Sequence, residues 1–128
     1  MNHQILIVED DPLLRRGMCA LLRPHGHALV AAGTVAEARA HLAAGPPSHA
    51  IVDLNLPDGT GADVVREIRG RGLPARVMIL TGSPDADLVA AARALGVDAV
   101  VAKPPDWNAV VRWAAGPADG GGGNGAPT

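Results

Sequence analysis

Residues 50–59 read AIVDLNLPDG, and this stretch decides the fold. Its three apolar residues end at Asp53, and a Pro-Asp-Gly loop begins at Pro57. A short apolar run that ends in a polar residue and a turn is typical of a strand buried in a parallel sheet. Open α/β sheets bind their ligands beyond the carboxyl ends of such strands. The position of Asp53 therefore predicts a functional site.

Two other apolar runs end in residues of matching chemistry. Residues 5–8 lead into Glu9-Asp10-Asp11, and residues 100–102 lead into Lys103-Pro104. In a parallel sheet these ends meet at one edge, so we expect Glu9, Asp10 and Asp53 to converge with Lys103 beside them.

A cluster of carboxylates with one lysine suits a hard cation and a phosphoryl group. Mg²⁺ in proteins is held by a few carboxylates together with water and phosphate oxygens. A carboxylate can also accept a phosphoryl group, while Mg²⁺ and a lysine neutralise the charge on that group. The run of residues 75–80 ends at Thr81-Gly82, where a hydroxyl and a closely approaching backbone could contact a phosphate. These features together predict a phosphorylation switch.

Strand and helix patterns alternate five times along the chain, which predicts a parallel sheet covered by helices on both faces. The first helix opens at Asp11-Pro12, with Leu14, Met18 and Leu21 as its buried stripe. Thr34 and Glu37 form a capping box for the second helix, and Ser83-Pro84 caps the fourth. The predicted strands cover residues 4–8, 27–32, 49–53, 75–80 and 99–102. The last three helices cover about residues 60–69, 85–95 and 106–115.

Composition and length exclude several classes of protein. The chain has 128 residues, which fits one domain over residues 1–116 and a flexible Gly/Pro-rich tail over residues 117–128. A net charge of −2 gives no broad field for nucleic acid or a membrane surface. Cys19 is the single cysteine, so we expect no disulfide, no zinc site and a cytoplasmic setting.

The chain resembles the receiver domain of two-component response regulators over about residues 3–115. Four pieces carry the resemblance, in the same order and at similar spacing. They are Ile-Leu-Ile-Val-Glu9-Asp10-Asp11, Val52-Asp53-Leu54-Asn55-Leu56-Pro57, Ile79-Leu80-Thr81-Gly82 and Val101-Ala102-Lys103-Pro104. The resemblance implies a flavodoxin-like (βα)5 sheet with strand order 2-1-3-4-5, which agrees with the alternation.

The resemblance also implies a role for each matching residue. Asp53 would accept the phosphoryl group from a phosphohistidine. Asp10 would bind Mg²⁺ directly, Glu9 mainly through water, and Asn55 through its backbone carbonyl. Thr81, Gly82 and Lys103 would contact the phosphoryl oxygens, and the Lys103-Pro104 bond is expected to be cis.

The implied function is a stand-alone receiver that catalyses only its own phosphorylation and dephosphorylation. A histidine kinase or a histidine phosphotransfer protein would donate the phosphoryl group. The output would be a change in a surface that binds another protein, with no nucleic acid and no membrane involved.

Two positions depart from the usual receiver pattern. The residue three before the lysine is usually aromatic and reorients when the threonine moves, but here it is Val100. An aromatic residue often follows Lys-Pro, and here Pro105 takes that place. We therefore expect any switch to act through Thr81, the loop that follows it, and the surface formed by the last two helices and the strand between them.

Two other functions stay open from the residues alone. A small Mg²⁺-dependent phosphohydrolase with an aspartyl nucleophile would need a second acid/base carboxylate near Asp53, where the chain has Asn55. A nucleotide- or flavin-binding module would need glycines after the first strand, where the chain has acids.

Several polar and aromatic residues also have simple structural explanations. We expect Asp11 to cap a helix and Asp58 to form a turn. Asp85, Asp87 and Asp106 would be acids in the first turn of a helix. Of Trp107 and Trp113, one would pack in the core while the other stays partly exposed.

Overall fold

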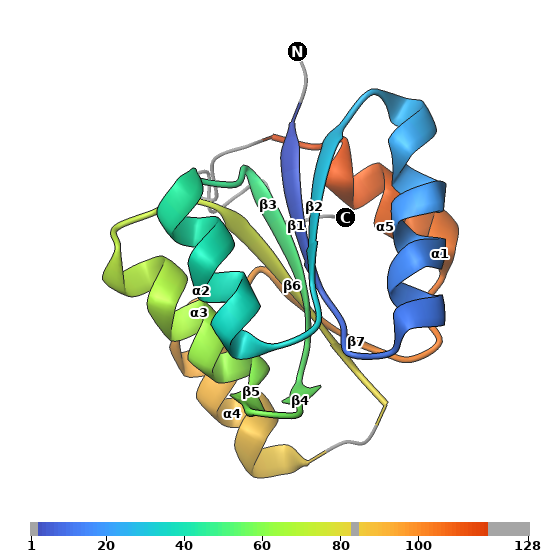
Figure 1. The fold of residues 1–128 in the computed structure, drawn as a ribbon. Coiled ribbons are helices and arrows are strands. Elements are labelled where there is room, and N and C mark those ends of the chain that lie inside the picture. Colours follow the sequence, from blue (N-terminus) through green and yellow to red (C-terminus); the bar gives the residue numbers. More distant parts are fainter. Residues whose placement is uncertain (1–2, 83–84, 118–128) are drawn as a thin grey trace.

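The computed structural model describes residues 3–82 and 85–117, which form a three-layer α/β domain (Figure 1). Five parallel strands form the central sheet in the order β2-β1-β3-β6-β7. This order equals 2-1-3-4-5 for the main strands and confirms the predicted topology. The sheet strands are β1 (Gln4–Val8), β2 (Ala28–Ala32), β3 (His49–Asp53), β6 (Arg76–Thr81) and β7 (Ala99–Ala102). The helices are α1 (Pro12–Leu22), α2 (Val35–Ala44), α3 (Gly61–Gly70), α4 (Ala86–Ala94) and α5 (Trp107–Ala114), with a short 3-10 helix at Arg23–His25.

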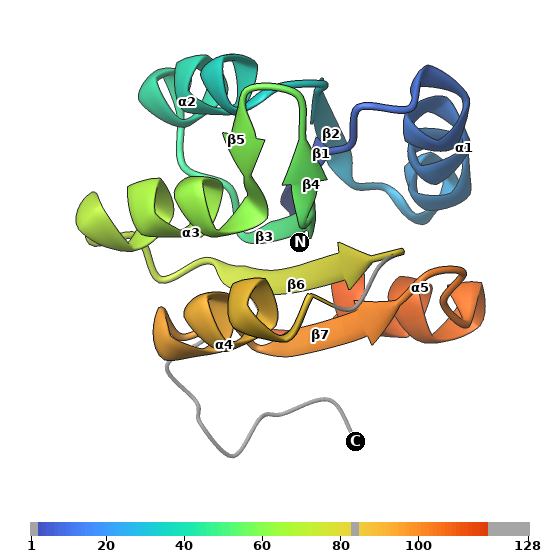
Figure 2. The ribbon, with the colours of Figure 1, turned by 90° about the horizontal axis from the view of Figure 1, so that it is seen from below.

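Alternate residues of each strand pack on opposite faces of the sheet. From β1, Leu6 and Val8 join a core with α2, α3 and α4, whereas Ile5 and Ile7 join a core with α1 and α5. Figure 2 shows this division, with α1 and α5 together on one side. Both faces of the central strands are therefore apolar, which explains their continuous apolar sequence.

The α1 face differs from the predicted stripe. Met18, Cys19 and Leu22 are buried, while Leu14 and Leu21 lie half-exposed at the edge of that face. Residues 18, 19 and 22 follow helical spacing, so the buried side is rotated from the one that the leucines suggested.

A two-stranded hairpin, β4 (Asn55–Leu56) with β5 (Gly59–Thr60), follows β3 where the sequence suggested only a loop. Asp58 at its tip accepts hydrogen bonds from the backbone N–H groups of Val35 (2.7 Å) and Ala36 (3.0 Å). These bonds lower the pKa of Asp58. Asp58 is thus a cap for α2 as well as a turn residue, and it ties the hairpin to that helix.

Aspartates are the N-cap residues of α1, α4 and α5. Asp11 accepts from the N–H groups of Leu13 and Leu14, as expected. Asp85 and Asp106 are N-caps of α4 and α5 rather than acids within the first turn. Ser83 and Pro84, predicted to cap the fourth helix, lie outside the described residues, as does the predicted tail beyond Pro117. Within the described residues, no helix has the length and apolarity needed to span a bilayer.

His49 is the first residue of β3 and is completely buried at the amino edge of the sheet. The Ser48 hydroxyl lies 2.9 Å from its Nδ1, and the Trp113 ring packs edge-on at a centroid distance of 5.1 Å. The expectation for the two tryptophans is confirmed, because Trp113 is buried and Trp107 is half-exposed. Burial, followed by the charges of His3, Arg76 and His27, lowers the pKa of His49 to about 4.

We predict that His49 makes the fold sensitive to acid. The unfolded chain takes up this proton near pH 6.5 and the folded chain only near pH 4. The stabilisation is therefore complete above pH 6.5 and is lost as the pH falls towards 4, by about 3 kcal/mol in total. The test is urea unfolding of His49→Gln and of the wild type between pH 4 and 7. The difference between their free energies of unfolding should change over this interval.

The free energy of the variant is compared with that of the wild type because other buried groups titrate in the same pH interval. His41→Gln is the matched control, since His41 lies partly exposed on α2 with a ring nitrogen 3.1 Å from the Ala31 carbonyl. Its free energy of unfolding is measured at the same pH values. A constant difference for His49→Gln would contradict the prediction.

Candidate functional site

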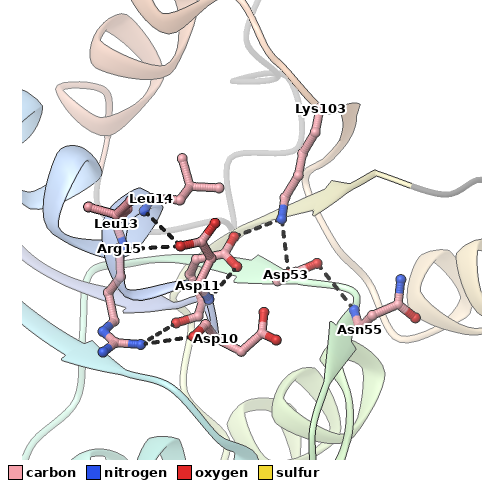
Figure 3. Close-up of polar contacts among 9 residues, drawn as sticks. Asp10, Asp11, Leu13, Leu14, Arg15, Asp53, Asn55 and Lys103 are labelled. Carbon is pink, nitrogen blue, oxygen red and sulfur yellow. Dashed lines mark hydrogen bonds and ion pairs between the residues drawn. The ribbon is translucent and has the colours of Figure 1, made fainter.

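Three carboxylates meet at the carboxyl edge of the sheet, as the strand ends predicted. Glu9 and Asp10 follow β1, and Asp53 is the last residue of β3 (Figure 3). Each can offer a carboxylate oxygen that lies within 4.8 Å of those of the other two. Glu9 and Asp53 are buried while Asp10 is exposed, so the cluster opens to solvent on the Asp10 side.

Lys103 reaches this cluster from the segment after β7. Its Nζ lies 2.7 Å from Glu9 Oε1 and 3.0 Å from Asp53 Oδ2. Burial alone would lower the pKa of Lys103, but its hydrogen bonds to Glu9 and Asp53 raise it above the ordinary value. Lys103 is the single lysine of the chain, and its compact ammonium bridges both carboxylates. The Lys103-Pro104 bond is cis, as expected.

Glu9 is the most deeply buried of the three acids, at 1% exposure. Burial raises its pKa to about 7, although hydrogen bonds from Lys103 and from the Asp11 N–H act in the opposite direction. A raised carboxyl pKa means that Glu9 stabilises the fold below about pH 4.5 and that this contribution is lost as the pH rises through 7. This trend opposes that of His49 over the same interval.

Asp53 is held in place by the backbone around it. Its Oδ1 accepts the N–H of Asn55 at 3.2 Å, and its Oδ2 faces Lys103. Gly61, the first residue of α3, lies so close that a Cβ there would be 2.6 Å from the Asp53 carbonyl oxygen. Glycine at this position therefore lets α3 begin directly against the end of β3.

The remaining predicted residues surround this cluster. Thr81 is buried at the end of β6, and its carbonyl accepts the Lys103 N–H at 2.8 Å. Gly82 and Asn55 are exposed, and Asn55 reaches Asp53 through its N–H. Val100 is half-buried and packs against the core on the α2–α4 face of the sheet.

Arg15 is a second cation near the cluster, which the sequence did not indicate. Its Nη1 donates to the carbonyl oxygens of Glu9 (2.8 Å) and Asp10 (3.4 Å). Arg15 thus contacts the backbone of Glu9 and Asp10, whereas Lys103 contacts the carboxylates of Glu9 and Asp53. A long side chain on α1 can reach back over the strand end, and spacing along the chain does not reveal such a contact.

The donor set fits a hard divalent cation such as Mg²⁺. Glu9, Asp10 and Asp53 offer only oxygen, which is the ligand that Mg²⁺ prefers, and one of the three faces solvent, where the metal could keep water ligands. These three side chains are the ones that would hold it.

We predict that Mg²⁺ stabilises the protein by relieving repulsion within the cluster. At ten times its dissociation constant it should add about 1.4 kcal/mol to the free energy of unfolding. Asp10→Ala should lose this gain and be at least as stable as the wild type without metal, because its exposed carboxylate makes no hydrogen bond within the described residues. Thermal unfolding of both proteins in EDTA and in Mg²⁺ tests this. A clearly less stable metal-free variant would show that Asp10 has a structural role.

Comparisons with known proteins agree with this geometry. The family model for the response regulator receiver domain matches residues 5–113. The acid tolerance regulatory protein ActR of Rhizobium meliloti is 39% identical over 105 residues, which are 82% of this chain and 54% of that protein. The chain thus spans about half the length of this curated relative.

Two solved structures share the fold. A CheY-like receiver domain protein from Methanospirillum hungatei superposes with a TM-score of 0.82 at 23% identity, covering 88% of this chain and 90% of that one. A Burkholderia pseudomallei response regulator was solved with a phosphorylated aspartic acid, calcium and citrate. It superposes with a TM-score of 0.79 at 23% identity, covering 86% of this chain and 65% of that one.

Proposed function

The chain belongs to the response regulator receiver domain family, and we propose that Asp53 is the residue through which it acts as a phosphoacceptor. Receiver domains are signalling modules that histidine kinases phosphorylate. The observation that supports Asp53 most strongly is its contact with the Lys103 ammonium, which it shares with Glu9 at the carboxyl edge of the sheet. The Burkholderia response regulator, which shares this fold, was solved with a phosphorylated aspartic acid.

In this proposal an Asp53 carboxylate oxygen attacks the phosphorus of a phosphohistidine in line with the leaving imidazole nitrogen. The P–O bond to Asp53 forms while the P–N bond breaks, and the imidazole leaves as a neutral ring that keeps the proton already on its other nitrogen. Oδ2 faces the site, whereas Oδ1 is held by the Asn55 N–H, so the carboxylate is already oriented. Lys103 then stabilises the phosphoryl oxygens, with the Thr81 hydroxyl as a second donor.

A bound Mg²⁺ would supply neutralisation of charge on the phosphoryl group. Glu9, Asp10 and Asp53 would hold it through carboxylates, and Asn55 through its backbone carbonyl. Gly82 lies next to Lys103, since a Cβ on it would be 3.7 Å from Lys103 Cδ. This leaves room for a phosphoryl oxygen close to the backbone.

The surface beside the site suits a protein as the phosphodonor. Leu13 on α1 is 73% exposed, directly after the loop that carries the acids. It lines an apolar groove with Leu14, Gly17, Met18, Leu21 and Trp107. A histidine kinase or phosphotransfer protein could bury this groove while it presents its phosphohistidine to Asp53.

For the output we propose a surface built around α4, β7 and α5, which would bind a downstream protein. The Lys103 N–H donates a hydrogen bond to the Thr81 carbonyl. A phosphoryl group that binds both side chains would therefore shift β6 and β7 together. Val100 supplies no ring for this change. We assign these functions to a domain over residues 1–116 in a cytoplasmic protein.

The stoichiometry of phosphate incorporation tests this function. With phosphoimidazole and Mg²⁺, the protein should gain a single acid-labile phosphoryl group, and EDTA should prevent the gain. With p-nitrophenyl phosphate it should release no more than one equivalent of nitrophenol. Sustained turnover of that ester would favour the phosphohydrolase instead.

A further inference from the structure

We propose that Arg15 is a positioning residue for phosphoryl transfer, and that it acts by holding the backbone of Glu9 and Asp10 in place. This inference rests on the proposed function. Arg15 lies on the first turns of α1, and its guanidinium bends back to the end of β1, as Figure 3 shows. Its Nη1 is 2.8 Å from the Glu9 carbonyl oxygen and 3.4 Å from that of Asp10.

The Glu9–Asp10 segment needs such support because little else fixes Asp10. The Glu9 N–H donates to Ala32 and extends the pairing of β1 with β2 by one residue. The Asp11 side chain then caps α1. Between these two anchors, Asp10 is exposed and its carboxylate makes no hydrogen bond within the described residues. Its direction is therefore set by its backbone, which Arg15 contacts on the carbonyl side.

A guanidinium suits this task better than an ammonium does. It is planar and always charged, and several of its N–H groups point in fixed directions. Arg15 is half-buried, which strengthens a charged hydrogen bond relative to one in water.

Gly33, in the loop between β2 and α2, leaves room for the guanidinium because it has no side chain. A Cβ at Gly33 would lie 2.9 Å from Arg15 Nη1 and 3.7 Å from its Cζ. The atoms in the way are the far ends of two flexible side chains, Arg15 and, at 3.4 Å, Glu37, so Gly33→Ala should fold while it displaces the guanidinium. This substitution disturbs Arg15 from another element and leaves the three acids unchanged.

The test compares Arg15→Gln with Arg16→Gln. Arg16 is the next residue on α1, is exposed and makes no hydrogen bond or ion pair within the described residues, so both variants remove the same charge from the same helix. The rate of labelling by phosphoimidazole is measured against Mg²⁺ concentration. Substitutions behind metal ligands weaken metal binding about tenfold or more, and we expect Arg15→Gln to raise the half-saturating Mg²⁺ concentration by about that factor. Arg16→Gln should match the wild type.

Three further variants test whether the effect comes from the position of the guanidinium rather than from its charge. Gly33→Ala should also raise the half-saturating Mg²⁺ concentration, and Gly33→Ala/Arg15→Gln should be no worse than Arg15→Gln alone. Arg15→Lys, which keeps the charge but not the planar guanidinium, should recover only part of the affinity.

Three results would overturn the proposal. Equal half-saturation for Arg15→Gln and Arg16→Gln would remove any special role of Arg15. Tighter Mg²⁺ binding by Arg15→Gln would show that the arginine acts only as a repelling charge. A lower melting temperature in EDTA with unchanged half-saturation would mean a purely structural role. If the wild type is not labelled, the proposed function fails, and Mg²⁺ affinity from isothermal titration calorimetry still tests Arg15.

Discussion

Lys103→Met is expected to be the most damaging single substitution in the site. It leaves Glu9, which is 1% exposed, and Asp53 without the cation that bridges them at 2.7 and 3.0 Å. Removing one partner of a buried ion pair costs about 3 kcal/mol or more of unfolding free energy. The labelling rate should also fall about a hundredfold, as it does when one donor to a developing negative charge is lost.

The stability loss should depend on pH in a defined direction. Because burial already holds the pKa of Glu9 near 7, this group can take up a proton when Lys103 is absent. The loss should therefore be smaller at pH 6 than at pH 8. Chemical unfolding in EDTA at both values measures it. Lys103→Arg keeps the charge and serves as the control, with most of the stability and little of the labelling rate. A loss that is the same at both pH values would contradict the coupling of Lys103 with Glu9.

Asp53→Asn is expected to have the second large effect. It should abolish phosphorylation, since an amide cannot act as the nucleophile. Asparagine has nearly the same shape, and its carbonyl oxygen can still accept the hydrogen bond from Lys103. The variant should fold, and without metal its melting temperature should be close to that of the wild type. It should gain no phosphoryl group under conditions that label the wild type. Asp58→Asn, at the tip of the hairpin, is the control that should label normally, because Asp58 contacts α2 rather than Lys103.

The sequence predicted the sheet and the main residues of the site because both follow from local patterns. Apolar runs end where strands end, and polar residues such as Asp53 stand at the next position. Parallel pairing then brings Glu9 and Lys103 to the same edge, although 94 residues separate them.

Other features depend on contacts between distant parts of the chain, which the local sequence pattern does not predict. Asp58 caps a helix that begins 23 residues earlier, after the hairpin has folded back against it. Arg15 reaches the strand end through a long side chain that occupies space left free by Gly33. His49 is buried beside Trp113, and this burial, followed by the charges of His3 and Arg76, lowers its pKa. In each case a distant element supplies the partner.

The most direct measurement of the central claim locates the phosphoryl group in the chain. The protein is labelled with phosphoimidazole and Mg²⁺ and treated with borohydride, which reduces an aspartyl phosphate to homoserine, and its peptides are analysed by mass spectrometry. We predict homoserine at position 53 and at no other aspartate. Homoserine at Asp10, or a phosphoryl group that resists borohydride and lies on a histidine or serine, would contradict the assignment of Asp53 as the phosphoacceptor.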